Sequence, residues 1–326
     1  MDAKDQSPDF DSVLVLYIGG EGRSGSTVLA ELLGNHDGFF PVGEIRGVWH
    51  ALEDDSLCGC GRPFSKCDFW HQVGKRAFGG WDRIDVGTML NRDGKFARHR
   101  RIPRLLMSPF RWIDSADLDQ HREVLSRLYS AIKEESGCSV IVDSTKDPAY
   151  ALILRKIRQL DLRFVHLVRD SRAVAYSWSK KRVEQPEYRH HPVLKDSFLS
   201  SRSSWIEARD WVIKNLVFHL LARSAQYRFL KYESLISDPA QELAHLLRLA
   251  DQGQVNANDA EFEFLPFHML GGNRVRFEQG QIKLRVDDEW KTKMPISQRR
   301  IVGLLTLPLL IAYGYVDVPV KLERSL

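Results

Sequence analysis

The stretch "GGEGRSGST", residues 19–27, has the composition of an anion-binding turn. A phosphate-binding loop of the ATPase type reads G-x-x-x-x-G-K-[ST], and Gly20 and Gly25 have that spacing, but Ser26 stands where the lysine should be. Backbone N–H groups at a helix start attract anions, and Arg23 could grip a terminal phosphate through two hydrogen bonds. The loop therefore predicts a nucleotide-phosphate site that lacks the lysine of metal-assisted γ-phosphoryl transfer.

A second group of candidate anion ligands lies in "VRDSRAVAYS". Arg169 follows an apolar run at a predicted strand end, which is where open α/β sheets bind ligands, and Ser177 lies eight residues further on. Taken alone, Arg169 is better explained as the partner of Asp170 or of another carboxylate.

Glu44, in "FFPVGEIRGVW", is the candidate general base. It comes shortly after the predicted phosphate-loop helix, and Phe40, Val42 and Trp49 flank it in the sequence. Desolvation by such neighbours would raise the pKa of the carboxyl, which suits a base. The alternative is a salt bridge from Glu44 to Arg46.

Three further polar residues lie in or after apolar runs. Lys146 and Asp143 belong to "VIVDSTKDP", and "VIVD" is similar to the second ATPase motif, whose aspartate serves magnesium. Without a lysine at position 26, Asp143 is predicted to be structural or to orient Lys146. His166, inside "RFVHLV", is predicted to be a core histidine.

The elements that would position these residues alternate between strand and helix patterns. This alternation predicts an α/β fold, a P-loop-like open and mostly parallel sheet flanked by helices with loop and helical insertions. We expect a frayed N-terminus over residues 1–12 and one domain over residues 13–326, with an irregular insertion at about 50–114. Ser171 is the expected cap of its helix. The predicted strands are 13–20, 139–143, 163–168 and 227–232, and the predicted helices are 24–33, 115–136, 148–160, 171–182, 203–225 and 238–250.

Composition limits the class of protein. The chain has 326 residues, 43% hydrophobic residues and a net charge of +4, which suits an enzyme with an anionic ligand better than a nucleic-acid binder. No early segment has the pattern of a secretory signal, and the late apolar run containing Pro308 is too short and interrupted to span a bilayer. We expect a cytoplasmic protein without a membrane span.

Three of the four cysteines lie together in "CGCGRPFSKC", residues 58–67. With Asp68 and His71 nearby they form a weak candidate for a zinc site, because the spacing departs from the usual zinc patterns. The sequence favours a glycine-rich turn with reduced thiols, with a redox-labile disulfide as the next alternative.

"GRSGST" and "VRDSRAVAYS" together strongly resemble the two nucleotide-binding signatures of the sulfotransferase family, which uses 3′-phosphoadenosine 5′-phosphosulfate (PAPS) as donor. The resemblance is to bacterial sulfotransferases, with features of the tyrosylprotein and carbohydrate branches. It extends to "VDSTKDP", "FLKYESLISDP" and "GQIKLRVDDEW", and so runs from residue 13 to about 290. The family has a P-loop-like sheet without the kinase lysine pattern.

The resemblance implies PAPS as donor co-substrate and no metal. It assigns the 5′-phosphosulfate to Arg23, Ser24, Gly25, Ser26 and Thr27, and the 3′-phosphate to Arg169 and Ser177. Tyr232 matches a position near the nucleotide, with a buried tyrosine at a strand end as the alternative. The stretch "GGNRVRFEQGQIKLRVDDEW", residues 271–290, could close over the nucleotide through Arg274, Arg276 or Lys283, and Lys283 is the predicted contact.

For the transfer step, the chain resembles the tyrosylprotein and carbohydrate branches of the family and not the cytosolic sulfotransferases. Cytosolic sulfotransferases use a histidine in a Lys-Thr-His stretch, and "DSTKDP" lacks it. The tyrosylprotein and carbohydrate branches place a catalytic glutamate where Glu44 stands, and Lys146 matches a lysine that steadies the leaving phosphate oxygen.

The leading hypothesis is therefore a sulfotransferase that moves a sulfuryl group from PAPS to a hydroxyl or amine by in-line displacement. The alternatives are a degenerate P-loop kinase or NTPase, and a non-enzymatic protein that keeps the nucleotide fold for binding. The expected acceptor is a small molecule, saccharide or lipid and not a nucleic acid. Basic stretches at 91–112 and 179–191 could recruit an anionic acceptor or be solvated surface. The sequence favours no oligomeric state.

Overall fold

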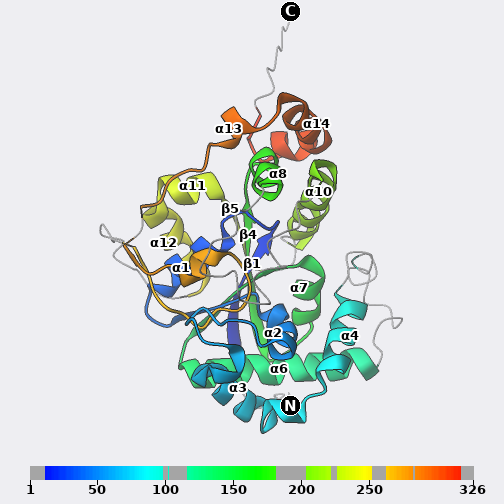
Figure 1. Cartoon of the computed structure of the whole chain (residues 1–326), viewed down its shortest axis with the longest axis vertical. Helices are drawn as coiled ribbons and strands as arrows, with labels where there is room; N and C mark the ends of the chain where they lie inside the picture. The colour runs from blue at the N-terminus through cyan, green and yellow to red at the C-terminus, as the bar shows by residue number, and fades with distance from the viewer. Residues whose placement is uncertain are drawn as a thin grey trace, which may run out of the picture.

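The computed structural model describes residues 12–97, 102, 116–180, 203–221, 226–251, 262–281 and 283–316. Its centre is a five-stranded sheet in which neighbouring strands run parallel (Figure 1). The predicted open, parallel α/β sheet is confirmed. The strand order is β2-β3-β1-β4-β5, and the strands are β1 (Val13–Gly20), β2 (Phe39–Gly43), β3 (Val140–Lys146), β4 (Leu160–Val168) and β5 (Tyr227–Lys231), with a separate antiparallel pair β6 (Glu263–Phe264) and β7 (Gly280–Gln281).

The central strand is β1, and its apolar sequence VLVLYIGG accounts for that position. Successive side chains of a strand point to opposite faces, so Val15 and Tyr17 enter the core on one face while Leu16 and Ile18 enter the core on the other. Burial on both faces is typical of parallel sheets covered by helices on both sides. Because the strands run parallel, their carboxyl ends meet at one edge of the sheet.

Helices cover both faces of this sheet (Figure 1). Side chains of α1, α11 and α12 contribute to the core on one face, and those of α6, α7 and α10 to the core on the other. The helix bounds are α1 (Ser26–Gly34), α2 (Val48–Asp54), α3 (Asp68–Phe78), α4 (Val86–Phe96), α6 (Ala116–Ser136), α7 (Pro148–Leu154), α8 (Ser171–Ser179), α10 (Ser204–Leu221), α11 (Tyr232–Ser237), α12 (Pro239–Leu249), α13 (Trp290–Lys293) and α14 (Ile296–Ala312).

The expected irregular insertion at 50–114 is wrong in its described part, which is largely helical. It contains α3 and α4 and most of α2, and α3 packs against α6. In α3 the buried residues Phe69, Trp70 and Val73 recur at helical spacing and anchor the helix in the core. The glycines, prolines and cysteines of the intervening loops conceal this periodicity in the sequence.

Several element ends also differ from the prediction. α7 ends at Leu154, six residues early, and β3 continues to Lys146. The cap of α8 is Asp170 and not Ser171, because the Asp170 carboxylate accepts a hydrogen bond from the backbone N–H of Arg172 at 2.8 Å. Asp170 and Ser171 are neighbours in the sequence, and aspartate and serine are both common N-cap residues.

The late apolar run forms α14, with Pro308 inside the helix. Among the residues that the structure describes, no helix is both long and apolar enough to cross a membrane.

Candidate active site

The glycine loop, residues 19–27, joins β1 to α1 at the carboxyl edge of the sheet. Gly25 caps α1 with a φ of 91°, and a Cβ at this position would come within 2.5 Å of the Tyr232 ring. Gly20 has a φ of 136°, and a Cβ there would lie 2.2 Å from the carbonyl oxygen of Leu167. Only glycine tolerates these conformations and contacts, so both glycines are required by the turn.

The glycine loop forms part of the wall of a cavity of about 830 Å³. This volume lies within the usual range of small-molecule sites. Ser24, although buried, and the exposed Lys283 are not among its lining residues. Nine of the predicted site residues do line it: Arg23, Gly25, Ser26, Thr27, Glu44, Lys146, Arg169, Ser177 and Tyr232.

Arg23 extends from the glycine loop toward α8. Its Nε donates a hydrogen bond to the Ser177 hydroxyl at 3.3 Å, and its guanidinium lies 5.4 Å from the ring centre of Trp178. The backbone of Arg23 has a φ of 68°, in the left-handed region that non-glycine residues seldom adopt. Such a conformation costs energy and is found where the surrounding structure fixes a residue for a purpose.

Arg169 directly follows β4, and its side chain is 7% exposed. It donates to the carbonyl oxygens of Arg23 and Asp287, both at 3.1 Å, and also pairs with the Asp287 carboxylate at 3.1 Å. Its guanidinium lies over the Tyr232 ring at 4.5 Å. Arg169 therefore pairs with a carboxylate, as the alternative interpretation predicts, and its partner is Asp287. Asp170 is bound by Arg172 instead. The pairing leaves Arg169 on the cavity wall.

Glu44 and Lys146 come from the ends of neighbouring parallel strands. Glu44 follows β2 and Lys146 is the last residue of β3, so the two side chains meet at the same edge. Lys146 Nζ lies 2.5 Å from Glu44 Oε1 and donates to the Ser144 carbonyl oxygen at 2.7 Å. Lys146 also has a positive φ, of 67°. An ammonium and a carboxylate are thus held together at one end of the cavity.

The surroundings of Glu44 differ from the apolar setting expected. Its side chain is 33% exposed and faces Lys146, whereas Phe40 packs on Phe69 and Trp49 on Trp81. Phe40 and Trp49 point away from Glu44 because each packs against an aromatic ring of the helical region at 48–96, and Val42 is buried in the core.

The alternative partner of Glu44, Arg46, is bound by two other carboxylates. It lies 2.8 Å from Asp93 and 2.7 Å from Asp147. Burial raises the pKa of Asp93, although Arg46 acts in the opposite direction. All three residues line the cavity beside the Glu44–Lys146 pair, so this end of the cavity is polar and charged.

Asp143 and His166 are core residues. Asp143 is fully buried, accepts hydrogen bonds from Tyr129 Oη at 2.5 Å and the Thr145 N–H at 2.8 Å, and burial raises its pKa to about 6. His166 is hydrogen-bonded to Tyr227 and Asn215, and burial lowers its pKa to about 4. Neither lines the cavity, as the structural interpretation of each predicts.

The late segment, residues 265–273, reaches the cavity through residues that the sequence analysis did not select. Gly272 and Asn273 line it, and the Asn273 N–H donates to Thr27 Oγ1 at 3.2 Å. Arg276 donates to the carbonyl oxygen of Gly272 at 3.2 Å and is buried. Neither Arg276 nor Arg274 is among the lining residues, so the expected arginine contact with the cavity is not made by these two.

Glu21, Trp178 and Lys214 also line the cavity and are absent from the predicted site. Glu21, 1% exposed, accepts hydrogen bonds from the Gly22 N–H at 2.7 Å and from Lys214 Nζ at 2.8 Å, and Trp178 adds an indole ring. Glu21 lies inside the glycine loop and could have been selected. Lys214 lies within the long helix α10, where nothing in the local sequence marks it.

Some expectations lie outside the described residues. They are the frayed N-terminus over 1–11, most of the basic stretch at 91–112 beyond residue 97, and the basic stretch at 179–191 beyond residue 180.

The parallel sheet and the glycine loop that opens α1 define a P-loop-like α/β protein. Residues 89–265, more than half of the chain, match the family described as the sulfotransferase domain. The chain belongs to this family and is therefore an enzyme, a transferase that moves sulfuryl groups.

Solved structures include similar folds. The sulfotransferase domain from the Synechococcus PCC 7002 olefin synthase is 18% identical with a TM-score of 0.51, over 97% of this chain and 100% of that one. The sulfotransferase domain from the curacin biosynthetic pathway is 16% identical with a TM-score of 0.49, over 94% and 99%. The first of these supports the fold. No curated protein matches the chain.

Proposed function

We propose that the enzyme transfers the sulfuryl group of PAPS to an acceptor hydroxyl or amine, using Glu44 as base and Lys146 at the leaving oxygen. One observation carries the proposal. A single cavity is lined by the helix-opening glycine loop with its Arg23, by Arg169 and by the Glu44–Lys146 pair. Sulfuryl transfer requires groups that bind the donor, a cation at the leaving oxygen and a base at the acceptor, all within one space.

The donor end would use the glycine loop and its arginines. The backbone N–H groups at the start of α1 and the Ser26 and Thr27 hydroxyls suit the 5′-phosphosulfate. Arg169 and Ser177 suit the 3′-phosphate, since Arg23 connects them through its side chain and its carbonyl oxygen. The 3′-phosphate would replace the carboxylate of Asp287 as the partner of Arg169.

The reacting end would use the Glu44–Lys146 pair. The acceptor oxygen forms a bond to sulfur while the bond from sulfur to the bridging phosphate oxygen breaks, and Glu44 takes the acceptor proton. Lys146 stabilises the negative charge that develops on the departing adenosine 3′,5′-bisphosphate. The acceptor hydroxyl would replace the Lys146 ammonium as the partner of Glu44 Oε1.

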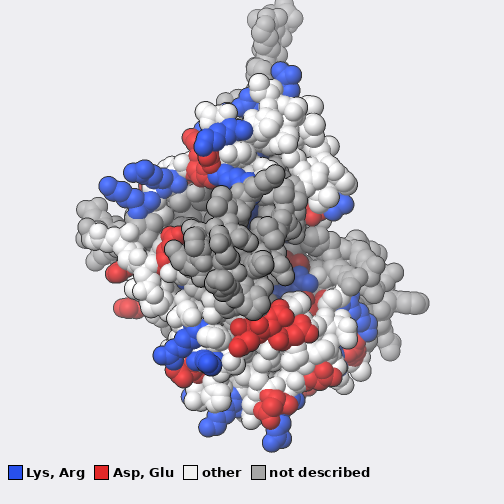
Figure 2. All heavy atoms as spheres, viewed as in Figure 1, with Lys and Arg blue, Asp and Glu red and all other residues white. Residues whose placement is uncertain are grey.

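The acceptor end of the cavity favours a polar, uncharged or cationic group. Arg46, Asp93 and Asp147 line it together with His50 of α2. Acidic side chains gather on the surface over α2 (Figure 2), whose exposed last turn carries Glu53 and Asp54. This charge disfavours a polyanionic acceptor on that side, so a hydroxyl-bearing small molecule, saccharide or lipid headgroup is the better candidate.

The deciding experiment is thermal unfolding with adenosine 3′,5′-bisphosphate or with ATP and magnesium. At about 100 times its dissociation constant, a ligand of the native state adds about 2.7 kcal/mol to the free energy of unfolding. We expect the bisphosphate alone, without added metal, to raise the melting temperature. Stabilisation by magnesium-ATP alone would contradict the proposal and favour a kinase. Turnover is then measured with PAPS and a panel of hydroxyl acceptors.

A further inference from the structure

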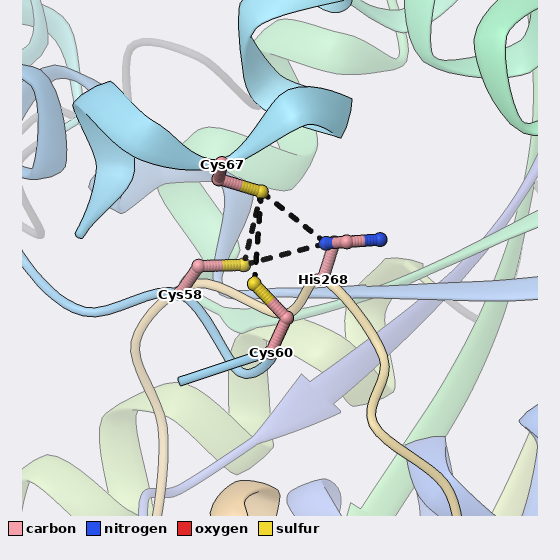
Figure 3. A group of neighbouring side chains, drawn as sticks. All are labelled: Cys58, Cys60, Cys67 and His268. Atoms are coloured by element: carbon pink, nitrogen blue, oxygen red, sulfur yellow. Dashed lines mark hydrogen bonds between the residues drawn. The ribbon is translucent and has the colours of Figure 1, made fainter. Parts of the chain in front are cut away.

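Four potential metal ligands meet outside the cavity lining (Figure 3). Cys58, Cys60 and Cys67 belong to the cysteine loop, residues 58–67, and His268 belongs to the late segment. Their ligand atoms all lie within 4.8 Å of one another. His268 is 201 residues beyond Cys67, so the sequence pointed to Asp68 and His71 as nearby ligands and not to His268.

Four of the six separations within this cluster are close to those of a tetrahedron, and the remaining two lie within 4.8 Å. Ligand bonds of about 2.3 Å to sulfur and about 2.0–2.1 Å to nitrogen require S–S distances of about 3.8 Å and S–N distances of about 3.6 Å. The Sγ of Cys67 lies 3.7 Å from that of Cys58 and 3.8 Å from that of Cys60. His268 Nδ1 lies 3.7 Å from Cys58 Sγ and 3.3 Å from Cys67 Sγ. A disulfide, with sulfurs about 2.05 Å apart, does not describe these distances, and the cysteines are free.

The cysteine loop is shaped by its own backbone. The Cys58 N–H donates to the Arg62 carbonyl oxygen at 2.9 Å, and the Gly61 N–H donates to that of Cys58 at 2.8 Å. Gly61 has a φ of 81°, which a glycine adopts without strain. The turn therefore points the sulfurs of Cys58 and Cys60 toward the same space.

Other contacts fix the histidine. The His268 ring stacks on Phe69 with ring centres 4.9 Å apart and planes at 8°, and the His268 carbonyl oxygen accepts a hydrogen bond from Trp70 Nε1 at 3.0 Å. Phe69 and Trp70 lie in the first turn of α3, which begins directly after Cys67. The same helix thus positions a cysteine and the histidine. The residues first considered as ligands lie apart: Asp68 is 89% exposed beside Arg62, and His71 is exposed.

We propose that Cys58, Cys60, Cys67 and His268 bind one structural Zn²⁺ ion. Three thiolates and a neutral imidazole form a closed tetrahedral set, which is typical of structural zinc, and zinc prefers sulfur and nitrogen ligands in this geometry. Binding releases the three thiol protons. The site is independent of the identity of the sulfuryl donor.

The zinc would connect the late segment, which is hydrogen-bonded to the backbone of the proposed base Glu44, to the cysteine loop. The Gly59 N–H donates to the Met269 carbonyl oxygen at 2.9 Å, and the Glu44 N–H donates to that of Leu270 at 2.6 Å. The Leu270 N–H in turn donates to Val42 at 3.0 Å. The late segment is therefore bonded on one side to the cysteine loop and on the other to the backbone of Glu44. Zinc at His268 would stabilise both contacts.

The first test is the zinc content of the purified full-length chain. We expect one zinc per chain in the wild type, and loss of zinc in Cys58→Ser and Cys67→Ser. Cys138→Ser is the matched control, since Cys138 is also a buried free thiol but lies outside the cluster. A zinc-free wild type from zinc-supplemented medium would overturn the proposal. Retention of one zinc by the Cys58→Ser, Cys67→Ser double variant would overturn it as well.

The second test needs only the wild-type chain and does not depend on variants folding. Replacement by cobalt(II) should give the intense visible absorption of tetrahedral cobalt thiolates, and a chelator should abolish it. Chelation should also lower the melting temperature, and added zinc should restore it. After denaturation with chelator and without reductant, all four cysteines should react with an alkylating reagent. Two cysteines missing from that count would show a disulfide in place of the metal.

Discussion

The glycine loop and the cysteine loop are both short glycine-containing turns that the late segment contacts, but their polar groups face in different directions. The glycine loop turns Arg23, Ser26 and Thr27 toward a cavity of about 830 Å³. The cysteine loop turns its sulfurs toward one another and toward His268. Groups facing open space suit a ligand that enters and leaves, whereas a closed set of four suits a resident ion. Variants of the first loop and its neighbours should change binding and turnover, and variants of the second should change stability.

Glu44→Gln should give the largest effect. It removes the proposed base while preserving the size of a side chain whose backbone is held by the late segment, so turnover should fall by about 10²- to 10⁴-fold. Steady-state kinetics with PAPS measures the loss, and calorimetry should show unchanged affinity for adenosine 3′,5′-bisphosphate. Wild-type turnover in this variant would place the base elsewhere.

Arg169→Ala should come next. Hydrogen bonds to charged groups contribute about 1.5–3 kcal/mol, so binding of adenosine 3′,5′-bisphosphate should weaken by about 10- to 100-fold. Binding of 5′-AMP should change much less, because it has no 3′-phosphate. Arg209→Ala, which removes an exposed arginine that pairs with Asp210, is the control for net charge. Equal losses for both nucleotides would remove Arg169 from the 3′-phosphate.

Gly59→Ala tests the backbone contact between the cysteine loop and the late segment. A Cβ at Gly59 would lie 2.4 Å from the Phe267 carbonyl oxygen and 3.1 Å from the Met269 nitrogen, so the free energy of unfolding should fall by about 1–3 kcal/mol. Gly61→Ala is the matched control, since its Cβ would have no neighbour within 4 Å and only the positive φ would be strained. Denaturant unfolding measures both. If the free energy of unfolding falls equally in the two variants, the contact between the cysteine loop and the late segment contributes little to stability.

Asp143→Asn should have the smallest effect on ligand binding and turnover, because Asp143 does not line the cavity. The folded-state pKa of Asp143, about 6, exceeds its ordinary value of 3.8, so the folded protein holds a proton that the unfolded chain releases. The free energy of unfolding should therefore fall as the pH rises from about 4 to about 6, by about 2–3 kcal/mol, and the variant should lose this contribution. Asp54→Asn, at an exposed position, should keep it. Weaker binding of adenosine 3′,5′-bisphosphate in Asp143→Asn would instead assign Asp143 to the ligand.

Sequence predicted the parts of the site that are local. Val13–Gly20 is a continuous apolar run closed by glycines, and its strand was predicted to the residue. Gly20 and Gly25 imposed the turn, and the ends of parallel strands had to bring Glu44 and Lys146 to one edge. The contacts of these residues depended on other elements and could not be predicted. The sequence suggested Arg46 for Glu44, whereas its partner is Lys146. For Arg169 it suggested Asp170 or another carboxylate, and the partner is Asp287.

Long-range residues explain what was missed. Lys214 reaches the cavity from the middle of α10, and His268 joins three cysteines far away in the sequence. Neither belongs to a motif, because tertiary packing and not spacing brings them into place. The helices at 48–96 were missed for a related reason. α3 and α4 pack on α6 and α2 packs on α4, and the loop residues between these helices obscure the helical period of their apolar residues.

The left-handed backbone at Arg23 and Lys146 has a consequence for protein engineering. A non-glycine residue in this region is disfavoured by about 1–2 kcal/mol, and glycine would remove that cost at either position. A search for thermostable variants would therefore be drawn to these two sites. The variants it selected would lack the guanidinium or the ammonium that lines the cavity, so heat resistance here would be gained at the expense of the proposed donor binding and transfer.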